Sequence, residues 1–459
     1  MLYTNNQKSS LRLLHWVQFR YIAYSVIFLS PLPFGSTSAV WQWFWVLYIG
    51  GVSVVFFLRE KKGTFDLESP ARKIIAPLLL VAVFIIWGCA QALVPMEPTM
   101  PESKLGVSHV FEYTNKISAN PYATMANAAF FLAHIIFFLL VYSLCIKNNN
   151  MEQLIFLCGI AALGYSFYGL IEFFIGNEKV LWIIKNKPLY GPESLSSTFI
   201  NRNNYAAFSG LGVQCLIASA FHLFNRKKLY SGASFFIRFG WLVLAIYLVA
   251  TSVFLSNSRA GTLSTAFGVC LLVLLSFRPK PFFRQKKLRI ASAAIAFLAV
   301  ICVVALSGND LVQRIENGDG VDDRANLYRT TITVILERPV IGSGLGTFEE
   351  TLQAFRDQSV DLFFRRGHND YLEIAMTAGL PAALLLILAF FFILKEFLSS
   401  RRRQPFHQPT IALGISFMVQ MALHSALDFP LQIPAISYFW CGILAASFAA
   451  SYRSRVSAR

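Results

Sequence analysis

Apolar segments long enough to cross a lipid bilayer recur along almost the whole chain. A helix needs about 20 apolar residues to cross a hydrocarbon core of ~30 Å, and about twelve such segments can be placed. They fall at 17–34, 40–58, 74–94, 124–146, 153–175, 205–224, 236–255, 260–277, 289–306, 371–394, 410–427 and 436–452. Because 56% of the 459 residues are hydrophobic and only 14% are charged, a water-soluble core could not bury this apolar surface. The sequence therefore predicts an all-α integral membrane protein with about 12 transmembrane helices.

The basic residues are distributed unevenly between alternate loops. If the N-terminus is on the inner side, most of the 40 Lys and Arg residues fall in inner loops, and most acidic residues fall in outer ones. This is the distribution that the positive-inside rule describes. We expect both termini in the cytoplasm and the polar loop 307–369 outside. All seven Cys lie within or at the ends of apolar segments, so no disulfide framework is expected.

The loop 307–369 is the longest stretch between apolar segments. Apolar positions recur at helical spacing over 323–337 and again over 348–364, which predicts two helices in this loop. Residues 342–348 are rich in glycine, and such a loop can cradle phosphate, but this spacing alone is weak evidence. The acidic run 316–323 lacks the ligand spacing of a calcium loop, and we interpret it as a solvated turn.

Charged and amide side chains also lie where other outer loops meet apolar segments. Asn201 and Arg202 precede the segment 205–224, where they could cap a helix or add an anion site at its N-terminus. Arg259 lies in a tight turn at the outer interface, and either a functional role or snorkelling to lipid headgroups could explain it. Glu172 ends an apolar segment near the outer face, where a carboxylate needs a bundle-facing position or an Arg partner.

The exit of the large loop combines Arg365, Arg366 and His368 directly before an apolar segment. Guanidinium forks suit a pyrophosphate, and an imidazole can accept a proton or stabilise charge. The sequence therefore indicates a site for a lipid-linked substrate that is already activated. Two further residues, His424 and Asp428, lie at the linker between the last two apolar segments and could reach the same outer face.

Several classes of chemistry have no counterpart in the sequence. No group of His, Cys, Asp and Glu has metal-ligand spacing, no serine nucleophile motif occurs, and no nucleotide-binding signature lies on the inner side. We expect neither a metal nor another cofactor. The net charge of +16 follows membrane topology, and the basic loop 278–289 indicates contact with anionic lipid. The lipid bilayer is therefore an expected partner, and nucleic acid is not.

Four motifs together resemble those of the O-antigen ligase/polymerase superfamily. They are STFINRNNY at 197–205, SNSRAG at 256–261, RP followed by GSGLGTF within 338–348, and HNDYL at 368–372. The resemblance covers about 196–395. It implies a multi-span enzyme with a large periplasmic loop, which transfers a glycan from undecaprenyl pyrophosphate to an acceptor without a metal or nucleotide. Ligases use lipid A-core as the acceptor, and polymerases use another repeat unit.

The resemblance also implies roles for individual residues. By position, Arg202 and Arg259 match pyrophosphate-contacting arginines, and His368 matches the catalytic base; we add Arg338 to the donor-binding set. Residues expected to support the site are Asn201, Arg324, Arg366, Asn369, Tyr371 and Glu172. The family often has Glu where this chain has Thr377, so no acid is expected to act there.

A ligase is the leading interpretation, and a polymerase or a transporter of lipid-linked sugar is an alternative. The transporter is disfavoured because the sequence contains no convincing inverted repeat. We expect a multi-pass protein of the bacterial inner membrane with its active loop in the periplasm. Its expected divisions are helices 1–5 in 1–195, helices 6–9 in 196–306, the periplasmic loop 307–370, and helices 10–12 with the cytoplasmic tail in 371–459.

Overall fold

The computed structural model describes residues 19–59, 72–96, 115–148, 150–176, 179–180, 183–184, 194–276, 321–355, 364–404 and 406–452. The helices through the first half are η1 (Phe34–Ser36), α2 (Ala39–Arg59), α3 (Arg72–Leu93), α5 (Pro121–Asn148), α6 (Met151–Ile175), α7 (Arg202–Asn225), η2 (Lys227–Leu229), α8 (Gly232–Leu255) and α9 (Arg259–Ser276). Those that follow are α12 (Val321–Glu337), α13 (Phe348–Phe355), α14 (Asp370–Ala378), α15 (Leu380–Arg403), α16 (Gln408–Ser425), η3 (Pro430–Gln432) and α17 (Pro434–Tyr452). The strands β1 (Lys179–Val180) and β2 (Ile183–Ile184) form a short antiparallel pair.

Nine of the described helices are long and apolar enough to cross a bilayer, namely α2, α3, α5, α6, α7, α8, α9, α15 and α17. A shorter apolar helix, Phe19–Leu29, lies within the predicted segment 17–34, and α16 coincides with the predicted segment 410–427. The predicted segment 289–306 lies outside the described residues. The all-α membrane class is therefore confirmed, whereas the count of about 12 spans stays a prediction.

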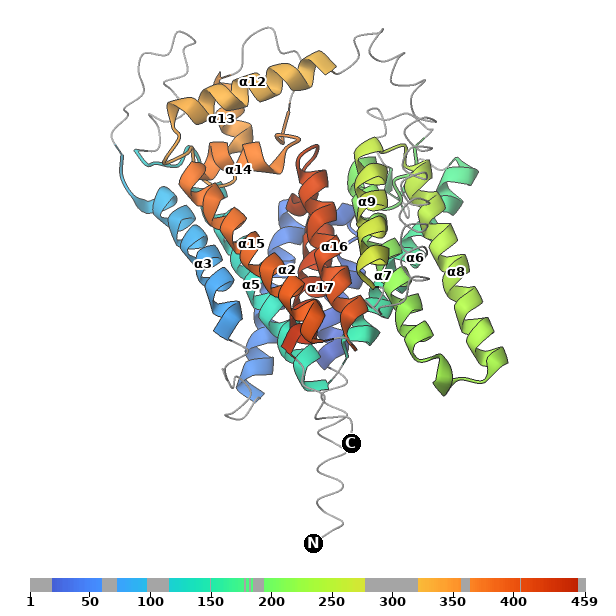
Figure 1. The fold of residues 1–459 in the computed structure, drawn as a ribbon. Helices are drawn as coiled ribbons and strands as arrows, with labels where there is room; N and C mark the ends of the chain where they lie inside the picture. Colours follow the sequence, from blue (N-terminus) through green and yellow to red (C-terminus); the bar gives the residue numbers. More distant parts are fainter. Residues whose placement is uncertain are drawn as a thin grey trace.

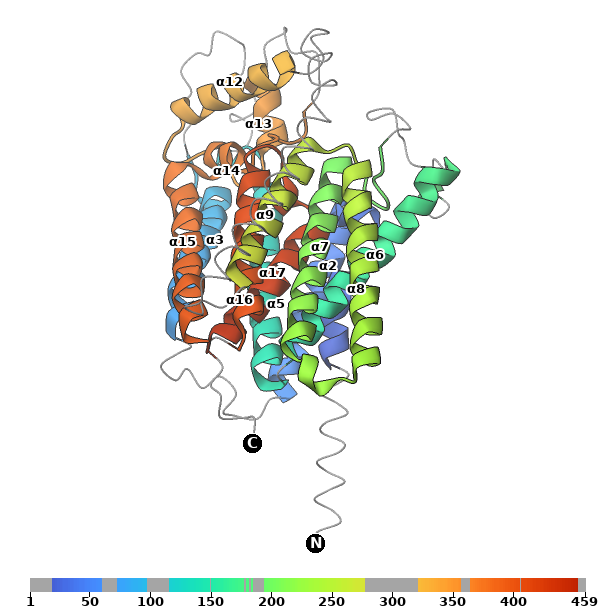
Figure 2. The same cartoon turned by 45° about the vertical axis from the view of Figure 1, so that its right-hand side comes forward.

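Helices α16 and α17 lie in the middle of the bundle, with α3 and α15 on one side and α6, α7, α8 and α9 on the other (Figure 1). Within the second group, α7 lies between α9 and α8 (Figure 2). In the most apolar window of α17, 89% of the residues are buried, and in α7 72%, against 22% in α2, α8 and α15. The rings of Phe208 and Phe417 both meet Phe439 of α17 edge to face. Since lipid is as apolar as these side chains, close packing holds the central helices together.

Small residues let α7, α9 and α16 approach one another closely. A Cβ at Gly210 would collide with Thr265, and a Cβ at Gly268 would lie 2.7 Å from Nε2 of Gln214. The amide of Gln420 donates to Thr265 at 3.1 Å, and Gln214 donates to Gln420. These buried interhelical hydrogen bonds fix the register of the three helices. Their register sets which residues meet at the ends of the bundle.

Helices α12, α13 and α14 form a cap over one end of the bundle (Figure 1). Leu327 and Val334 of α12 pack with Phe348 and Leu352 of α13 and with Met376 of α14. One face of α12 is thereby buried, as its amphipathic pattern predicts. The predicted helix at 323–337 is confirmed, and it lies on α13 and α14.

The glycine-rich segment 342–348 packs its backbone against neighbouring elements of the bundle. The φ angles of Gly344 and Gly346 are +110° and +80°, a region that favours glycine. A Cβ at Gly344 would collide with Ser118, and one at Gly346 would collide with Asn127. The glycines therefore permit a close approach of backbone to side chain, and the phosphate-cradle interpretation is not retained.

Two predicted elements have different limits in the structure. The second loop helix, expected over 348–364, is described as α13 up to Phe355; residues 356–363 lie outside the described part, and Phe364 is not helical. The single span expected over 371–394 is wrong, because Gly379 (φ +88°) separates α14 from α15, and α15 continues to Arg403. The apolar pattern runs through the break because α14 buries an apolar face in the cap and α15 is itself span-length.

Candidate functional site

His368 lies in the segment 364–369, directly before α14. Its side chain is 15% exposed and stands between the rings of Phe364 and Phe429, with centroid distances of 5.9 and 5.0 Å. The φ of His368 is +46°, which a non-glycine residue keeps only with support from its surroundings. The hydroxyl of Tyr328 in α12 donates to the carbonyl of His368 at 2.9 Å and supplies part of that support. The imidazole is thus held in one position and keeps a small exposed surface.

Asp428 fixes the tautomer of this imidazole. Nδ1 of His368 lies 3.2 Å from Oδ1 of Asp428, which also accepts the N–H of Phe429 at 3.0 Å. Burial alone would raise the pKa of Asp428, but the hydrogen bond and charge of His368, with contributions from His424 and Asn203, hold this pKa below its ordinary value. An ionised carboxylate can only accept, so Nδ1 of His368 carries the proton and Nε2 presents a lone pair.

Asn203 connects Asp428 to the start of α7. Its Nδ2 donates to Oδ2 of Asp428, and its backbone N–H donates to the side chain of the N-cap Asn201 at 2.7 Å. Arg202 lies between these two asparagines and is the half-buried first residue of α7. His368 and Arg202, which the sequence analysis assigned to one site, are therefore linked through the side chains of Asp428 and Asn203.

Arg259 begins α9 beside the start of α7. A Cβ at Gly261 would collide with Cβ of Ala206, so the first turns of the two helices are in contact. Oγ of Ser258 accepts the N–H of Gly261 at 3.1 Å, as an N-cap does. Within the described part of the chain, the half-buried Arg259 has no acidic partner. Two helix N-termini, each beginning with an arginine, thus lie at the same end of the bundle, and both features favour an anion there.

Two of the predicted supporting residues hold α14 against α16. The side chain of Asn369 caps α14 by accepting the N–H groups of Tyr371 and Leu372 at 3.0 and 3.1 Å, and its Nδ2 donates to the carbonyl of Ala426 at 3.1 Å. The hydroxyl of Tyr371 donates to the carbonyl of Ala422 at 2.8 Å. These bonds position His368, which directly precedes Asn369.

Asp370 makes a second buried connection between the same elements. Ser425 donates to its Oδ2 at 2.7 Å and Gln432 to its Oδ1 at 2.8 Å. Burial raises the pKa of Asp370 to about 7, and the negative charges of Glu373 and Asp428 act in the same direction, against the lowering effect of the two hydrogen bonds. At neutral pH this carboxyl group is therefore partly protonated.

Arg366 shapes the loop that carries His368. Its Nη1 lies 3.4 Å from Oε1 of the buried Glu373, whose Oε2 accepts the N–H of Gly367 at 2.7 Å. Arg366 therefore contacts a side chain of the protein itself, Glu373. It stabilises the backbone next to His368.

Of three remaining predicted residues, two lie away from His368, and the side chain of one, Arg324, is outside the described part. Arg338 is buried at the end of α12, where Leu380 donates to the carbonyl of Pro339, so a helix of nine residues, or ~13 Å, lies between Arg338 and the segment of His368. Arg324 lies in α12, and its side chain is outside the described part.

Glu172, the third of these residues, is buried near the end of α6 and accepts a hydrogen bond from Tyr168 at 3.2 Å. A Cβ at Gly169, one turn earlier, would lie 2.8 Å from Cβ of Ser197. Glu172 therefore lies close to the segment that leads into α7, rather than beside His368.

The comparison with known families concerns the same part of the chain. Residues 243–387 match the family model described as O-antigen ligase. This stretch belongs to the O-antigen ligase family. No curated protein matches the chain at a significant level. The O-antigen ligase domain contains Arg259, Arg338 and His368, whereas Arg202 and Asn203 precede it and Asp428 follows it. The site is therefore completed by residues on both sides of the matched stretch.

Two residues of this site, Asn203 and Asp428, are not in the set predicted from the sequence. Asp428 is expected from the sequence to reach the outer face, but its pairing with His368 is not, and Asn203 is not singled out. The available signal was an acidic residue in a short linker between two apolar segments, since such an acid is costly unless it is paired. His424, which the sequence analysis named together with Asp428, instead contacts α9, where its Nδ1 lies 3.4 Å from Oγ of Ser264. Asn203 lies in the motif at 197–205, but nothing in that motif distinguishes it from the neighbouring asparagines.

Proposed function

We propose that this chain is a glycan ligase, which transfers a polysaccharide from undecaprenyl pyrophosphate to lipid A-core. The observation that carries the proposal is the hydrogen-bonded connection from His368 through Asp428 and Asn203 to the start of α7, where Arg202 lies. It joins a group that can accept a proton to a position that favours an anion. A transfer from a pyrophosphate requires both in one place.

His368 acts as the general base for the acceptor hydroxyl. Asp428 holds the proton on Nδ1, so the lone pair of Nε2 receives the hydroxyl proton as the oxygen attacks the anomeric carbon. A new glycosidic C–O bond forms, and the bond between that carbon and the pyrophosphate oxygen breaks. The buried carboxylate of Asp428 stabilises the imidazolium that results.

Arg202 and Arg259 bind the pyrophosphate and stabilise it as it leaves. Negative charge increases on the leaving oxygen, and guanidinium groups at two helix N-termini oppose it. Asn201 contributes by capping α7, which orients the first N–H groups of that helix. Arg338 is not part of this donor set, because it lies at the far end of α14 from His368.

The free energy of the reaction comes from the donor, which is already activated as a pyrophosphate ester. The proposal therefore calls for no nucleotide, metal or other cofactor. It places the protein in the bacterial inner membrane with His368 facing the periplasm, in accordance with the charge distribution of the loops.

The decisive experiment uses the full chain in proteoliposomes with an undecaprenyl-pyrophosphate-linked glycan as the donor. Lipid A-core that gains the mass of the glycan supports the ligase. A ladder of lengthened lipid-linked glycans, formed with or without lipid A-core, would identify a polymerase instead. Donor that crosses the bilayer unchanged would identify a transporter and refute glycan transfer.

A further inference from the structure

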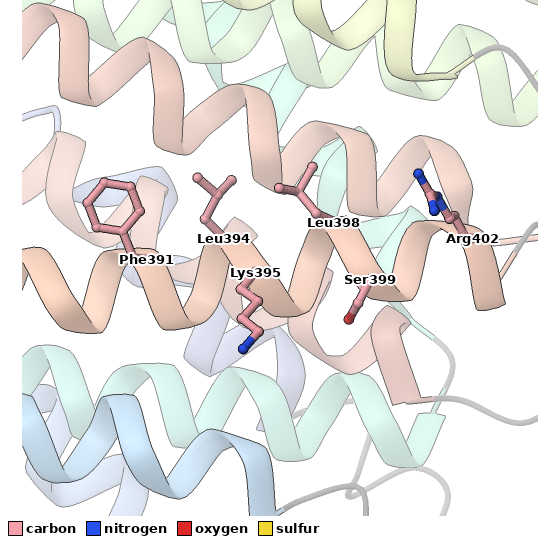
Figure 3. A pocket seen from close by; sticks show the side chains of 6 residues that line it. All are labelled: Phe391, Leu394, Lys395, Leu398, Ser399 and Arg402. Carbon is pink, nitrogen blue, oxygen red and sulfur yellow. The ribbon is translucent and has the colours of Figure 1, made fainter.

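A shallow groove runs along the exposed face of α15 toward its C-terminal end. It encloses about 410 Å³ and is lined by Phe391, Leu394, Lys395, Leu398, Ser399 and Arg402. Lys395 and Ser399 point to one side of the helix axis, and Leu394, Leu398 and Arg402 point to the other (Figure 3). The apolar side chains thus form one row that ends at Arg402, and Lys395 lies on the other side of the helix axis.

The polarity of the groove changes along the helix. Its apolar end begins at Phe391 and its far end is Arg402, eleven residues later; at ~1.5 Å per residue the groove is about 16 Å long. One leaflet of a hydrocarbon core of ~30 Å is about 15 Å deep. The apolar side chains from Phe391 to Leu398 extend over about 10 Å, which part of an acyl chain in one leaflet can cover, and Arg402 lies one turn beyond them.

The two cations of the groove are available to an external anion. The buried Glu396 already pairs with Lys73 at 3.0 Å and with Arg403 at 2.6 Å. Within the described ranges, neither Lys395 nor Arg402 has an acidic partner. Both are exposed, so an anion beside them needs no rearrangement of the bundle.

We propose that this groove is a binding site for an anionic phospholipid of the leaflet on the basic side of the bundle. The phosphate lies between Lys395 and Arg402, and an acyl chain lies along Leu398, Leu394 and Phe391. The bound lipid covers the outer face of α15. The N-terminal end of α15 adjoins α14, which follows the segment of His368.

The nearest competing occupant is a segment of the chain itself, since the sequence 277–306 combines a basic stretch with an apolar one. That basic stretch holds six Lys and Arg residues and no acid between 278 and 289. Contact with the groove would bring these charges next to Lys395 and Arg402 without compensation. Charge complementarity therefore favours the lipid.

The experiment is native mass spectrometry of the full chain in detergent, titrated with phosphatidylglycerol or phosphatidylcholine carrying identical acyl chains. Two interfacial cations, each contributing ~1 kcal/mol with an anionic lipid, predict about a 30-fold tighter Kd for phosphatidylglycerol. Lys395→Gln or Arg402→Gln alone should reduce this preference about fivefold, and the double variant should abolish it.

The matched control is Lys227→Gln with Lys228→Gln, which removes the same charge at the α7–α8 turn, and it should retain the preference of the wild type. Equal affinity for the two lipids, or no effect of the groove variants, would overturn the proposal. It would also be overturned if the control lost as much as the groove variant. Displacement of phosphatidylglycerol by millimolar inorganic phosphate would overturn the proposal in favour of a simple anion site, and failure to bind either lipid would overturn it as well.

Discussion

Nδ1 of His368 lies 3.2 Å from Oδ1 of Asp428, although the two residues are 60 positions apart in the chain. His368 precedes α14 in the cap, and Asp428 follows α16 of the bundle. The pair therefore exists only when the cap is seated on the bundle. Asn369, Asp370 and Tyr371 all bond to the α16–η3 region and hold it there.

Replacement of His368 by alanine should abolish glycan transfer. A general base contributes roughly 10²–10⁴-fold, so the rate in proteoliposomes should fall by at least two orders of magnitude. Expression and thermal unfolding should change little, because the side chain is partly exposed and its loop is held by Tyr328 and Glu373. Arg365→Ala, a change at a neighbouring exposed side chain, is the control. Activity within threefold of the wild type would remove His368 from the mechanism.

Asp428→Asn should lower the transfer rate by about 10²-fold or more, because a neutral amide cannot stabilise the imidazolium that forms when His368 takes the proton. Oδ1 of Asp428 accepts the N–H of Phe429 and lies beside Nδ1 of His368, so the oxygen of an asparagine is expected at that position, and the main change is the lost charge. The transfer rate measured from pH 6 to 9 checks this.

A matched variant for Asp428→Asn is Asn203→Ala. It leaves the carboxylate on His368 and should have a smaller effect on the rate. If Asp428→Asn were as active as Asn203→Ala, the charge of the carboxylate would not contribute to catalysis.

Much of this architecture could be predicted from the sequence, because the relevant signals are local. The spans follow from segment length, the α12 helix from apolar periodicity, and the starts of α7 and α9 from asparagine, serine and arginine before apolar runs. Family motifs predicted roles for Arg202, Arg259 and His368, and these roles stay predictions. Each of these inferences needs only a short window of sequence.

The remaining features depend on tertiary packing and leave no local trace. Asp428 meets His368 because α14 rests on α16, and no spacing along the chain reports that contact. The break at Gly379 was missed because apolar residues continue on both sides of it, one set facing the cap core and the other the bilayer. Arg338 is near the glycine-rich segment 342–348 in sequence, but its burial at the end of α12 separates it from His368.

The topology can be tested by labelling single cysteines with a membrane-impermeant maleimide. Val340→Cys, at a position 60% exposed in the cap, should react in intact spheroplasts. Lys228→Cys, exposed at the α7–α8 turn, should react only after permeabilisation. Ser343 and Ser400 are unsuitable sites because both are fully buried. The unmodified chain is the control for its own cysteines, and the reverse labelling pattern would contradict the charge-based orientation.

Asp370 should make the stability of the cap fall as pH rises. Its pKa in the folded protein is about 7 against an ordinary value of 3.8, so the folded state binds this proton more tightly than the unfolded state. The stabilisation is therefore fully present below pH ~4, decreases as the pH rises through about 7, and is absent above it. Asp370→Asn removes the buried negative charge, so Tm at pH 8 should rise by roughly 2–4 °C for each kcal/mol of destabilisation that is removed. Tm of this variant should also depend less on pH between pH 5 and 8 than Tm of the wild type. The control is Glu349→Gln, which replaces a half-exposed acid of α13. If Tm of Asp370→Asn depended on pH as strongly as Tm of the wild type, Asp370 would not be the cause of the pH dependence.

Arg259 should not tolerate replacement by lysine. Lysine keeps the charge but loses the planar fork that binds two phosphate oxygens, so Arg259→Lys should weaken apparent donor affinity and slow transfer. Arg259→Ala should be more severe, by roughly 2–3 kcal/mol for a lost charge-assisted contact. Because Arg259 has no acidic partner within the described part of the chain, loss of a protein ion pair does not complicate the comparison. If the side chain only reached lipid headgroups, lysine would serve equally well. A fully active Arg259→Lys enzyme with unchanged donor affinity would therefore refute the pyrophosphate role, and Arg202→Lys, measured in parallel, tests the start of α7 in the same way.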